Sequence, residues 1–156
     1  NSAVIKKVIS NLVLKTYFMR ISKIFVTVDA VIIKKTTDYE LLLIKRKNEP
    51  YKDCWALPGG FVDENEDLET AAKRELEEET QIKIDSLQQF GAFGKPFRDP
   101  RGHMVSIAYF GEVAANAIAV ASDDAKEVQW FSIQNLPTLA FDHQEIIQKA
   151  LKMFQL

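Results

Sequence analysis

Cysteine is scarce in this chain. Only Cys54 occurs among 156 residues, which excludes an intramolecular disulfide and a structural zinc site held by cysteines alone. A lone cysteine favours a reducing compartment, and we expect a cytoplasmic protein. Long apolar runs are absent as well, since none approaches the ~18 residues of a membrane-spanning helix, and this excludes a transmembrane protein. The formal net charge is only −2, so there is no global attraction to nucleic acid or to an anionic membrane.

The composition is that of one globular domain preceded by a basic extension. Hydrophobic residues make up 47% and charged residues 27%, without repeats or low-complexity segments. We place the domain at residues 24–156 and an amphipathic extension at residues 1–23, whose apolar residues recur at helical spacing: Val4, Ile5, Val8, Ile9, Leu12 and Val13. This extra N-terminal helix either packs on the domain or on a partner chain, or belongs to a targeting segment or processing remnant.

Strand and helix patterns are mixed along the domain. Runs rich in β-branched or alternating apolar residues predict strands over residues 24–33, 41–45, 104–113 and 128–132. Helical spacing predicts a helix over residues 67–80 and a final helix that begins at Asp142, with Glu145 completing a capping box. We expect a loop over residues 90–101 and an interruption at Pro58-Gly59-Gly60. The mixture predicts a single α/β or α+β domain.

The helix over residues 67–80 lies in the most acidic part of the chain, since residues 62–80 carry nine acids against two basic residues. Glu75, Glu78 and Glu79 are spaced i, i+3 and i+4 and therefore share one helix face. Their mutual repulsion destabilises an isolated helix, and a hard divalent cation such as Mg²⁺ or Mn²⁺ would offset it through oxygen ligands. A solvated acidic surface is the alternative at this point.

The wider spacing resembles the Nudix box, G-x5-E-x7-R-E-U-x-E-E-x-G-U, in which U is aliphatic. Its positions are occupied, in order, by Gly60, Glu66, Arg74, Glu75, Leu76, Glu78, Glu79 and Ile82. The one departure is Gln81, which stands where the family has its late glycine. That position follows the helix end, where a left-handed conformation is common, and glutamine there costs on the order of 1 kcal/mol if its φ is positive. We expect an altered loop and an intact site.

This resemblance to the Nudix family implies a mixed β-sheet sandwiched between helices, and hydrolysis of a nucleoside diphosphate linked to another group. It implies a Mg²⁺ or Mn²⁺ site whose ligands are the Gly59 carbonyl, Glu75, Glu78 and Glu79. Of these, Glu78 and Glu79 are also expected to act in catalysis. The residues expected to support the ligands are Gly60, Glu66 and Arg74. Bound metal would neutralise the pyrophosphate oxygens and lower the pKa of a bound water.

Outside the box, residues 25–151 resemble the bacterial and archaeal ADP-ribose pyrophosphatase branch of the family. The resemblance is carried by residues 25–30, 55–61, 98–103, 123–127 and 141–143. The expected substrate-binding residues are Arg46, Arg98, Arg101, His103 and His143. Each has a plainer alternative, such as an ion pair between Asp99 and Arg101 that holds a turn. Trp55 and Phe61 are interpreted as core residues rather than base-stacking platforms.

The activity implied is Mg²⁺-dependent hydrolysis of ADP-ribose to AMP and ribose 5-phosphate, with Asp124 or Glu127 assisting the attacking water. Two alternatives stay open: a pyrophosphohydrolase for an oxidised or ordinary nucleoside triphosphate or another diphosphate sugar, and a non-catalytic ADP-ribose sensor. Some relatives of this branch are transcription regulators with an appended winged helix. Because the last expected helix ends near Leu156, we expect no such module. The expected binding partner is a small nucleotide substrate. We expect no binding to nucleic acid or to a membrane, and a homodimer is left open.

Overall fold

The computed structural model describes residues 23–122 and 125–156, so the extension expected over residues 1–23 lies almost entirely outside the described residues. The strands are β1 (Ile24–Lys35), β2 (Tyr39–Arg46), β3 (Trp55–Ala56), β4 (Gly59–Phe61), β5 (Gln88–Phe93), β6 (His103–Val113) and β7 (Ala125–Ser132). The helices are α2 (Leu68–Thr80) and α3 (His143–Phe154). Within this part of the chain, no helix is long and apolar enough to cross a membrane.

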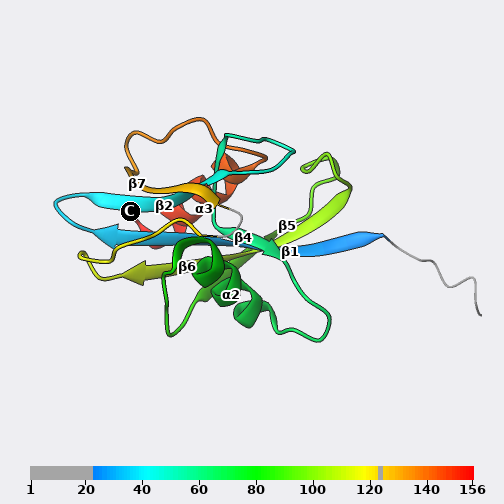
Figure 1. The fold of residues 1–156 in the computed structure, drawn as a ribbon, viewed down its shortest axis with the longest axis horizontal. Coiled ribbons are helices and arrows are strands. Elements are labelled where there is room, and N and C mark those ends of the chain that lie inside the picture. The colour runs from blue at the N-terminus through cyan, green and yellow to red at the C-terminus, as the bar shows by residue number, and fades with distance from the viewer. Residues whose placement is uncertain (1–22, 123–124) are drawn as a thin grey trace, which may run out of the picture.

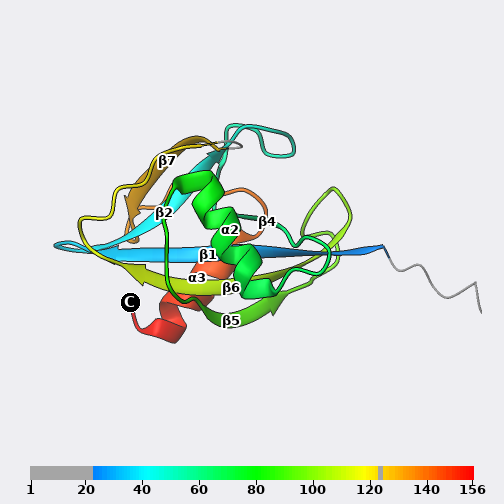
Figure 2. The same ribbon diagram turned by 60° about the horizontal axis from the view of Figure 1, so that its bottom comes forward.

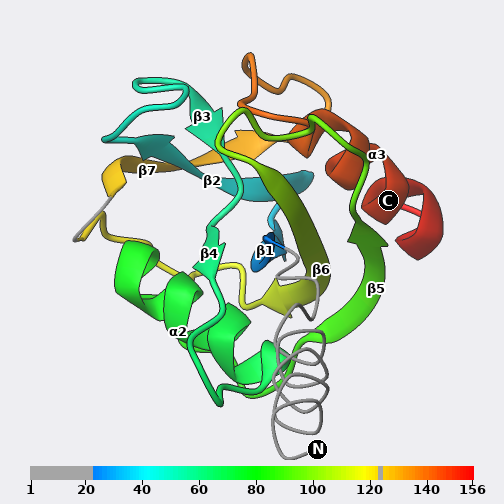
Figure 3. The ribbon, with the colours of Figure 1, turned by 90° about the vertical axis from the view of Figure 1, so that its right-hand side faces the viewer.

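The strands form one mixed sheet around β1 (Figure 1). Its order is β3-β2-β1-β6-β5, with β4 paired to β1 and β7 paired to β2. β1 runs parallel to β6 along nearly its whole length. On its other side, β1 pairs antiparallel first with β4 and farther along with β2. The short strand β4 is thereby held against the first half of β1, at the point where the chain passes from β3 toward α2 (Figure 3).

Helices α2 and α3 cover opposite faces of the sheet (Figures 2 and 3). Successive residues of β1 point to opposite faces and so enter two cores. The core beside α2 includes Val28, Ala30, Ile32, Ala71, Ala72 and Leu76. The core beside α3 includes Val31, Ile33, Ile146, Ile147 and Ala150. A strand covered on both faces is apolar at almost every position, which explains why residues 30–33 of β1 are all apolar. The expected mixed sheet between helices is confirmed.

Helix α2 ends where the sequence predicts and begins at Leu68, one residue later than predicted. Asp67 is its N-cap, and the Asp67 carboxylate accepts the backbone N–H groups of Glu69 at 3.0 Å and Thr70 at 3.4 Å. The helix ends at Thr80, and Gln81 adopts the left-handed conformation, with φ of 59° and ψ of 13°. The conformation expected at this position of the box is therefore confirmed.

Two predictions near the other elements are wrong. Residues 90–93, expected in a loop, belong to β5, an edge strand whose pairing with β6 shifts in register between Gln89 and Gly91. Asp142 precedes α3 but makes no capping bond with its side chain. Its carboxylate instead accepts both hydrogen bonds of the Arg98 guanidinium, so the expected capping box does not form.

The expected interruption at Pro58-Gly59-Gly60 is also wrong in part, because both glycines belong to β4. β4 lies so close to β1 that a Cβ atom at Gly59 would come within 2.1 Å of the Val28 carbonyl oxygen. Glycine is therefore required here by the close approach of two backbones. This approach brings the backbone of β4 alongside the C-terminal half of α2.

Candidate active site

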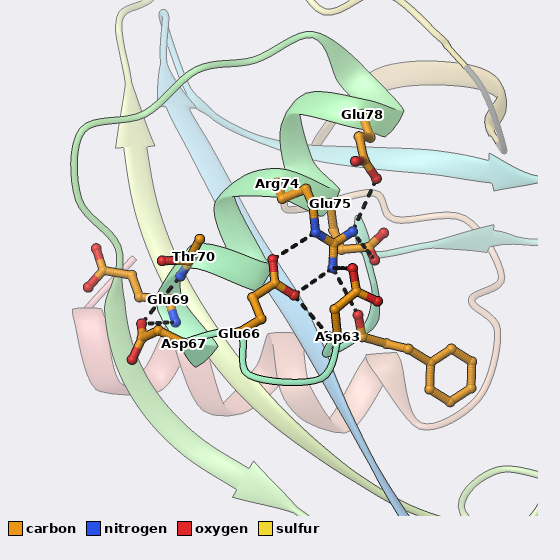
Figure 4. A network of polar contacts seen from close by, with 9 residues as sticks. Asp63, Glu66, Asp67, Glu69, Thr70, Arg74, Glu75 and Glu78 are labelled. Atoms are coloured by element: carbon orange, nitrogen blue, oxygen red, sulfur yellow. Dashed lines mark hydrogen bonds and ion pairs between the residues drawn. The ribbon is translucent and has the colours of Figure 1, made fainter.

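Arg74 joins the chain before α2 to the acidic face of the helix (Figure 4). Its Nε and Nη2 atoms each donate to a different Glu66 oxygen at 2.8 Å, and Nη2 also donates to the Phe61 carbonyl at 3.0 Å. Its Nη1 donates to Glu75 at 2.8 Å and to Glu78 at 3.2 Å. The bonds from Arg74 lower the pKa of Glu66 to about 2, and the bonds to Glu66 raise the pKa of Arg74. Both groups are therefore charged, and they hold the segment before α2 against the helix.

Two carboxylates of this face lie against β4. Glu79 is only 7% exposed, and its carboxylate accepts the Gly59 N–H at 3.0 Å. Burial raises the pKa of Glu79 to about 8. Glu75 covers Gly60, since a Cβ atom built there would come within 2.5 Å of the carboxylate carbon and both oxygens. Burial raises the pKa of Glu75 as well. Desolvated acids of this kind gain from a nearby cation, because it offsets the cost of their charge.

The two glycines of β4 also line a cleft of about 280 Å³ that contains cationic side chains. Arg46 at the end of β2 and Arg101 before β6 line this cleft together with Glu75 and Glu79. The Arg46 Nε donates to the Pro50 carbonyl at 2.8 Å, which fixes one edge of its guanidinium. Burial lowers the pKa of Arg46. Carboxylates and guanidinium groups thus meet in one cleft, as recognition of a metal-bound anion would require.

Aromatic rings pack on both guanidinium groups. The centre of the Phe141 ring lies 4.8 Å from the guanidinium carbon of Arg46 and 5.4 Å from that of Arg101. The Phe61 ring lies 5.3 Å from the same carbon of Arg101. Arg101 also donates to Asp99 through Nε and Nη2, at 3.0 and 2.6 Å, so the ion pair considered as an alternative does form. Phe61 is 41% exposed and lines the cleft, so its assignment to the core is wrong.

Arg98 and His143 lie around a second cavity, of about 30 Å³, which shares Gly59 and Gly60 with the cleft. The Arg98 side chain is 4% exposed and donates to the Asp142 carboxylate at 2.8 and 2.5 Å. Although burial acts to lower it, these bonds raise the pKa of Arg98. His143 is buried, and its burial lowers the pKa of the imidazole. Both side chains therefore line the second cavity and not the cleft.

Other predicted residues are not brought to the cleft. His103 is exposed at the start of β6 and lines neither cavity. Glu127 is exposed on β7, where it pairs with Lys45 at 3.0 Å. The Glu78 side chain is 49% exposed and lines neither cavity. Asp124 lies outside the described residues.

Sequence reasoning missed three residues at this site. Asp29 is buried in β1, and its Oδ1 lies 3.0 Å from where a Cβ of Gly59 would stand. An acid within the apolar run of residues 24–33 was a signal that could have identified it. Phe141 belongs to a segment that carries the resemblance, but neither it nor Lys47 was expected at the site, because only the folding of distant segments brings them to the cavities.

The donor set around β4 fits a hard divalent cation, since its side-chain donors are carboxylate oxygens and two of them are desolvated. In residues 23–122 and 125–156, no three His, Cys, Asp or Glu side chains are gathered closely enough to form a ready-made metal group. Glu78, the third acid of the face, is bonded to Arg74. Any ion held here would therefore need oxygens beyond those of Glu75 and Glu79.

Comparison with known proteins gives the context of this cleft. The family model described as NUDIX domain matches residues 23–150. The ADP-ribose pyrophosphatase of Methanocaldococcus jannaschii is 46% identical over 149 residues, an alignment that covers 94% of this chain and 84% of that protein.

Solved structures agree with the sequence match. A MutT/nudix family protein from Enterococcus faecalis superposes with a TM-score of 0.80 and 33% identity, over 92% of this chain and 68% of that one. The NUDIX domain of Shewanella oneidensis NrtR, in a cocrystal structure with ADP ribose, superposes with a TM-score of 0.78 and 29% identity. That superposition covers 90% of this chain and 97% of the NrtR domain.

Proposed function

This chain belongs to the NUDIX domain family and is a Nudix pyrophosphohydrolase, and we propose that it splits ADP-ribose into AMP and ribose 5-phosphate in the presence of Mg²⁺ or Mn²⁺. The observation that carries the proposal is one cleft that contains two desolvated carboxylates and two arginines packed on aromatic rings. The name of the Methanocaldococcus relative supports the choice of ADP-ribose. So does the ADP-ribose complex of the similarly folded NrtR domain.

The divalent ion would be held by the Gly59 carbonyl and by the carboxylates of Glu75, Glu78 and Glu79. When bound, it would neutralise charge on the diphosphate and acidify a water molecule. Burial raises the pKa of Glu79 to about 8 despite the nearby Arg46, so ionising this carboxylate is costly at neutral pH while no metal ion is bound. Metal binding and loss of the Glu79 proton are therefore linked. Glu78 and Glu79 are the ligands that we propose to act in catalysis, by orienting the attacking water.

Gly60, Glu66 and Arg74 would support these ligands. Arg74 bonds Glu75 and Glu78 through one nitrogen, and its other two nitrogens are held by both oxygens of Glu66. Glu66 in turn accepts the backbone N–H of Asp63 at 3.0 Å. This arrangement limits how far the acidic face can rotate. Gly60 contributes by leaving the space that the Glu75 carboxylate occupies.

We assign diphosphate binding to Arg46 and Arg101. A guanidinium group can pair with two phosphate oxygens at once, and stacking on Phe141 restricts both groups before substrate arrives. Arg98 and His143 are assigned to the support of the cleft, because their polar atoms are bonded within the protein. His103 receives no assignment, since it lines neither cavity.

A further carboxylate, Asp124 or Glu127, is proposed to assist the attacking water. The Glu127 side chain is 48% exposed and that of its partner Lys45 is 25% exposed, so release of Glu127 from this partly exposed ion pair would cost little. Comparison of Asp124→Asn with Glu127→Gln identifies the assisting residue. Its loss should lower kcat by roughly 10²- to 10⁴-fold without raising KM for ADP-ribose.

The substrate is tested by incubating the protein with Mg²⁺ and each compound of a panel, followed by chromatography of the products. The panel contains ADP-ribose, NADH, diadenosine polyphosphates, 8-oxo-dGTP and ordinary dNTPs. We expect preferred release of AMP and ribose 5-phosphate from ADP-ribose. Preferred release of pyrophosphate from a triphosphate would contradict the substrate assignment. Tight binding of ADP-ribose without turnover would indicate a sensor, the alternative that the NrtR domain favours.

We also place the enzyme in the cytoplasm, because its single cysteine suits a reducing compartment. A homodimer is proposed as its assembly state, through the apolar stripe predicted in residues 1–23. Light scattering of the full chain tests this, with a monomeric mass as the contrary result. Gel-shift titration with duplex DNA at several salt concentrations tests the proposed absence of a nucleic-acid partner.

A further inference from the structure

A buried polar network lies beneath the cleft and takes no direct part in the proposed reaction. Asp29 on β1, Ser106 on β6 and His143 on α3 are each no more than 7% exposed. The Ser106 hydroxyl donates to Asp29 Oδ2, and the Arg98 Nη2 lies 3.9 Å from the same oxygen. The His143 Nε2 lies 3.5 Å from Asp29 Oδ1. Burying so many polar groups is costly unless they are paired. Their pairing beneath β4 therefore indicates that the network has a function at this position.

His143 connects this network to the backbone that leads into β4. Its Nδ1 accepts the backbone N–H of Leu57, a buried residue, at 2.9 Å. Because Nδ1 is the acceptor, the proton of the neutral ring is on Nε2, which faces the Asp29 carboxylate. Burial lowers the pKa of His143 and so favours this neutral form. The imidazole thus links α3 and β1 to the chain just before Gly59.

The backbone of residues 57–60 is held at successive positions. The Leu57 N–H donates to His143, and the Pro58 carbonyl accepts the Ala30 N–H at 2.8 Å. The next N–H, of Gly59, donates to the Glu79 carboxylate at 3.0 Å. A displacement of Leu57 would therefore be transmitted within two residues to a proposed catalytic carboxylate.

We propose that His143 is a positioning residue, which holds the Leu57 backbone so that Gly59 and Glu79 stand in register, and which makes no contact with the substrate. This inference rests on the proposed function, since it concerns the same cleft. Its distinguishing feature is that only the hydrogen-bond acceptor at the Nδ1 position matters. The Nε2 side of the imidazole, which faces Asp29, does not set the position of Gly59 and Glu79.

Two substitutions separate the acceptor from the ring. In His143→Asn, the side-chain oxygen is bonded to Cγ, as Nδ1 is, and can accept the Leu57 N–H. In His143→Leu, a side chain of similar size leaves that buried N–H without an acceptor. We expect His143→Leu to lose roughly 10- to 100-fold in kcat and in Mn²⁺ affinity, the usual range for residues that orient metal ligands. His143→Asn should stay within about threefold of the native protein on both measures. KM for ADP-ribose should change little in either variant.

His143→Gln is the second variant, because its amide reaches the Nε2 position but places no acceptor at the Nδ1 position. It remains polar beside Asp29, and it should behave like His143→Leu. Gln144→Leu, at an exposed neighbouring position of α3, controls for a new leucine in the first turn and should match the native protein. Thermal melting of each variant establishes that it is folded under the assay conditions.

Amide hydrogen exchange supplies a readout that needs neither substrate nor metal. Exchange at Leu57 and Gly59 should be faster in the Leu and Gln variants and near native in His143→Asn. A rise of KM in the Asn and Leu variants, with Mn²⁺ affinity unchanged, would show a substrate-contacting residue and overturn the inference. A lower Tm with native kcat, Mn²⁺ affinity and Gly59 exchange would overturn it as well. Failure of the native protein to hydrolyse ADP-ribose would refute the proposed function alone, because exchange and Mn²⁺ binding still decide the role of His143.

Discussion

Substitution of Gly60 by alanine tests the position of the Glu75 carboxylate. The added Cβ would stand 2.5 Å from the carboxylate carbon and both oxygens, about 0.9 Å short of an ordinary contact near 3.4 Å. Glu75 must therefore move by nearly 1 Å, and Arg74, bonded to it at 2.8 Å, must follow or release it. Because a misplacement of that size costs about 10²-fold in rate, kcat/KM for ADP-ribose should fall about 100-fold. This loss corresponds to about 2.7 kcal/mol of transition-state stabilisation.

The assay combines steady-state kinetics with Mn²⁺ binding and thermal melting. Gly60→Ala should weaken Mn²⁺ binding along with kcat/KM and melt close to the native protein, since alanine suits an extended strand and Glu75 is not part of a core. Gly94→Ala is the matched control, because its new Cβ would meet the Val105 side chain, with the nearest methyl carbon at 3.1 Å, and no carboxylate. Native kinetics in Gly60→Ala would refute the reasoning, since displacement of the Glu75 carboxylate from its place over Gly60 would then have no effect on catalysis.

Three further predictions concern the end of α2, the ion pair of Arg74 with Glu66, and Arg46. Gln81→Gly should raise Tm modestly, because it relieves a left-handed residue at a cost of about 1 kcal/mol, and should change kcat less than about tenfold; a large gain in kcat would show that Gln81 impairs the site. Arg74 holds the pKa of Glu66 at about 2, below the ordinary 4.5. The stability that Glu66 adds is therefore full above about pH 4.5 and is lost as pH falls toward 2. In Glu66→Gln, the unfolding free energy measured in urea should depend less on pH in that interval, whereas an unchanged slope would contradict the stabilising ion pair of Glu66 with Arg74. Arg46→Lys should raise KM for ADP-ribose about tenfold with little change in kcat, because lysine cannot pair with two phosphate oxygens; an unchanged KM would remove Arg46 from the substrate site.

The parts of the fold that local sequence determines were predictable. Asp67 caps α2 by bonding residues two and three positions away, and the helix ends at Thr80 as its periodicity indicates. The acidic face was predictable for the same reason, since residues i, i+3 and i+4 of a helix share a face wherever the helix lies. The spacing from Gly60 to Glu79 therefore carried most of the information about the proposed metal ligands.

The remainder depends on contacts between distant segments. A Gly-Gly pair predicts a break in regular secondary structure. Here it forms a strand only because β1 lies against it. Asp142 has the sequence of a helix cap, but Arg98, 44 residues earlier, takes its carboxylate. Arg46, Arg101 and Phe141 meet through tertiary packing alone, so their stacking has no signature in any short stretch. The sequence allowed arginines and histidines to be proposed as site residues. It could not predict which of them lie in the cleft and which lie in the interior.

The most direct test of the account is the rate of AMP release from ADP-ribose as Mg²⁺ is titrated, for the native protein, Glu79→Gln and Glu77→Gln. Glu79 lies buried against Gly59, whereas Glu77 is exposed on the same helix and pairs with Lys83. We predict saturable activation by Mg²⁺ in the native protein and in Glu77→Gln, and a loss of at least about 10²-fold in folded Glu79→Gln. Native-like turnover in Glu79→Gln, or AMP release that is independent of Mg²⁺, would contradict the central claim that this carboxylate cleft is the catalytic centre.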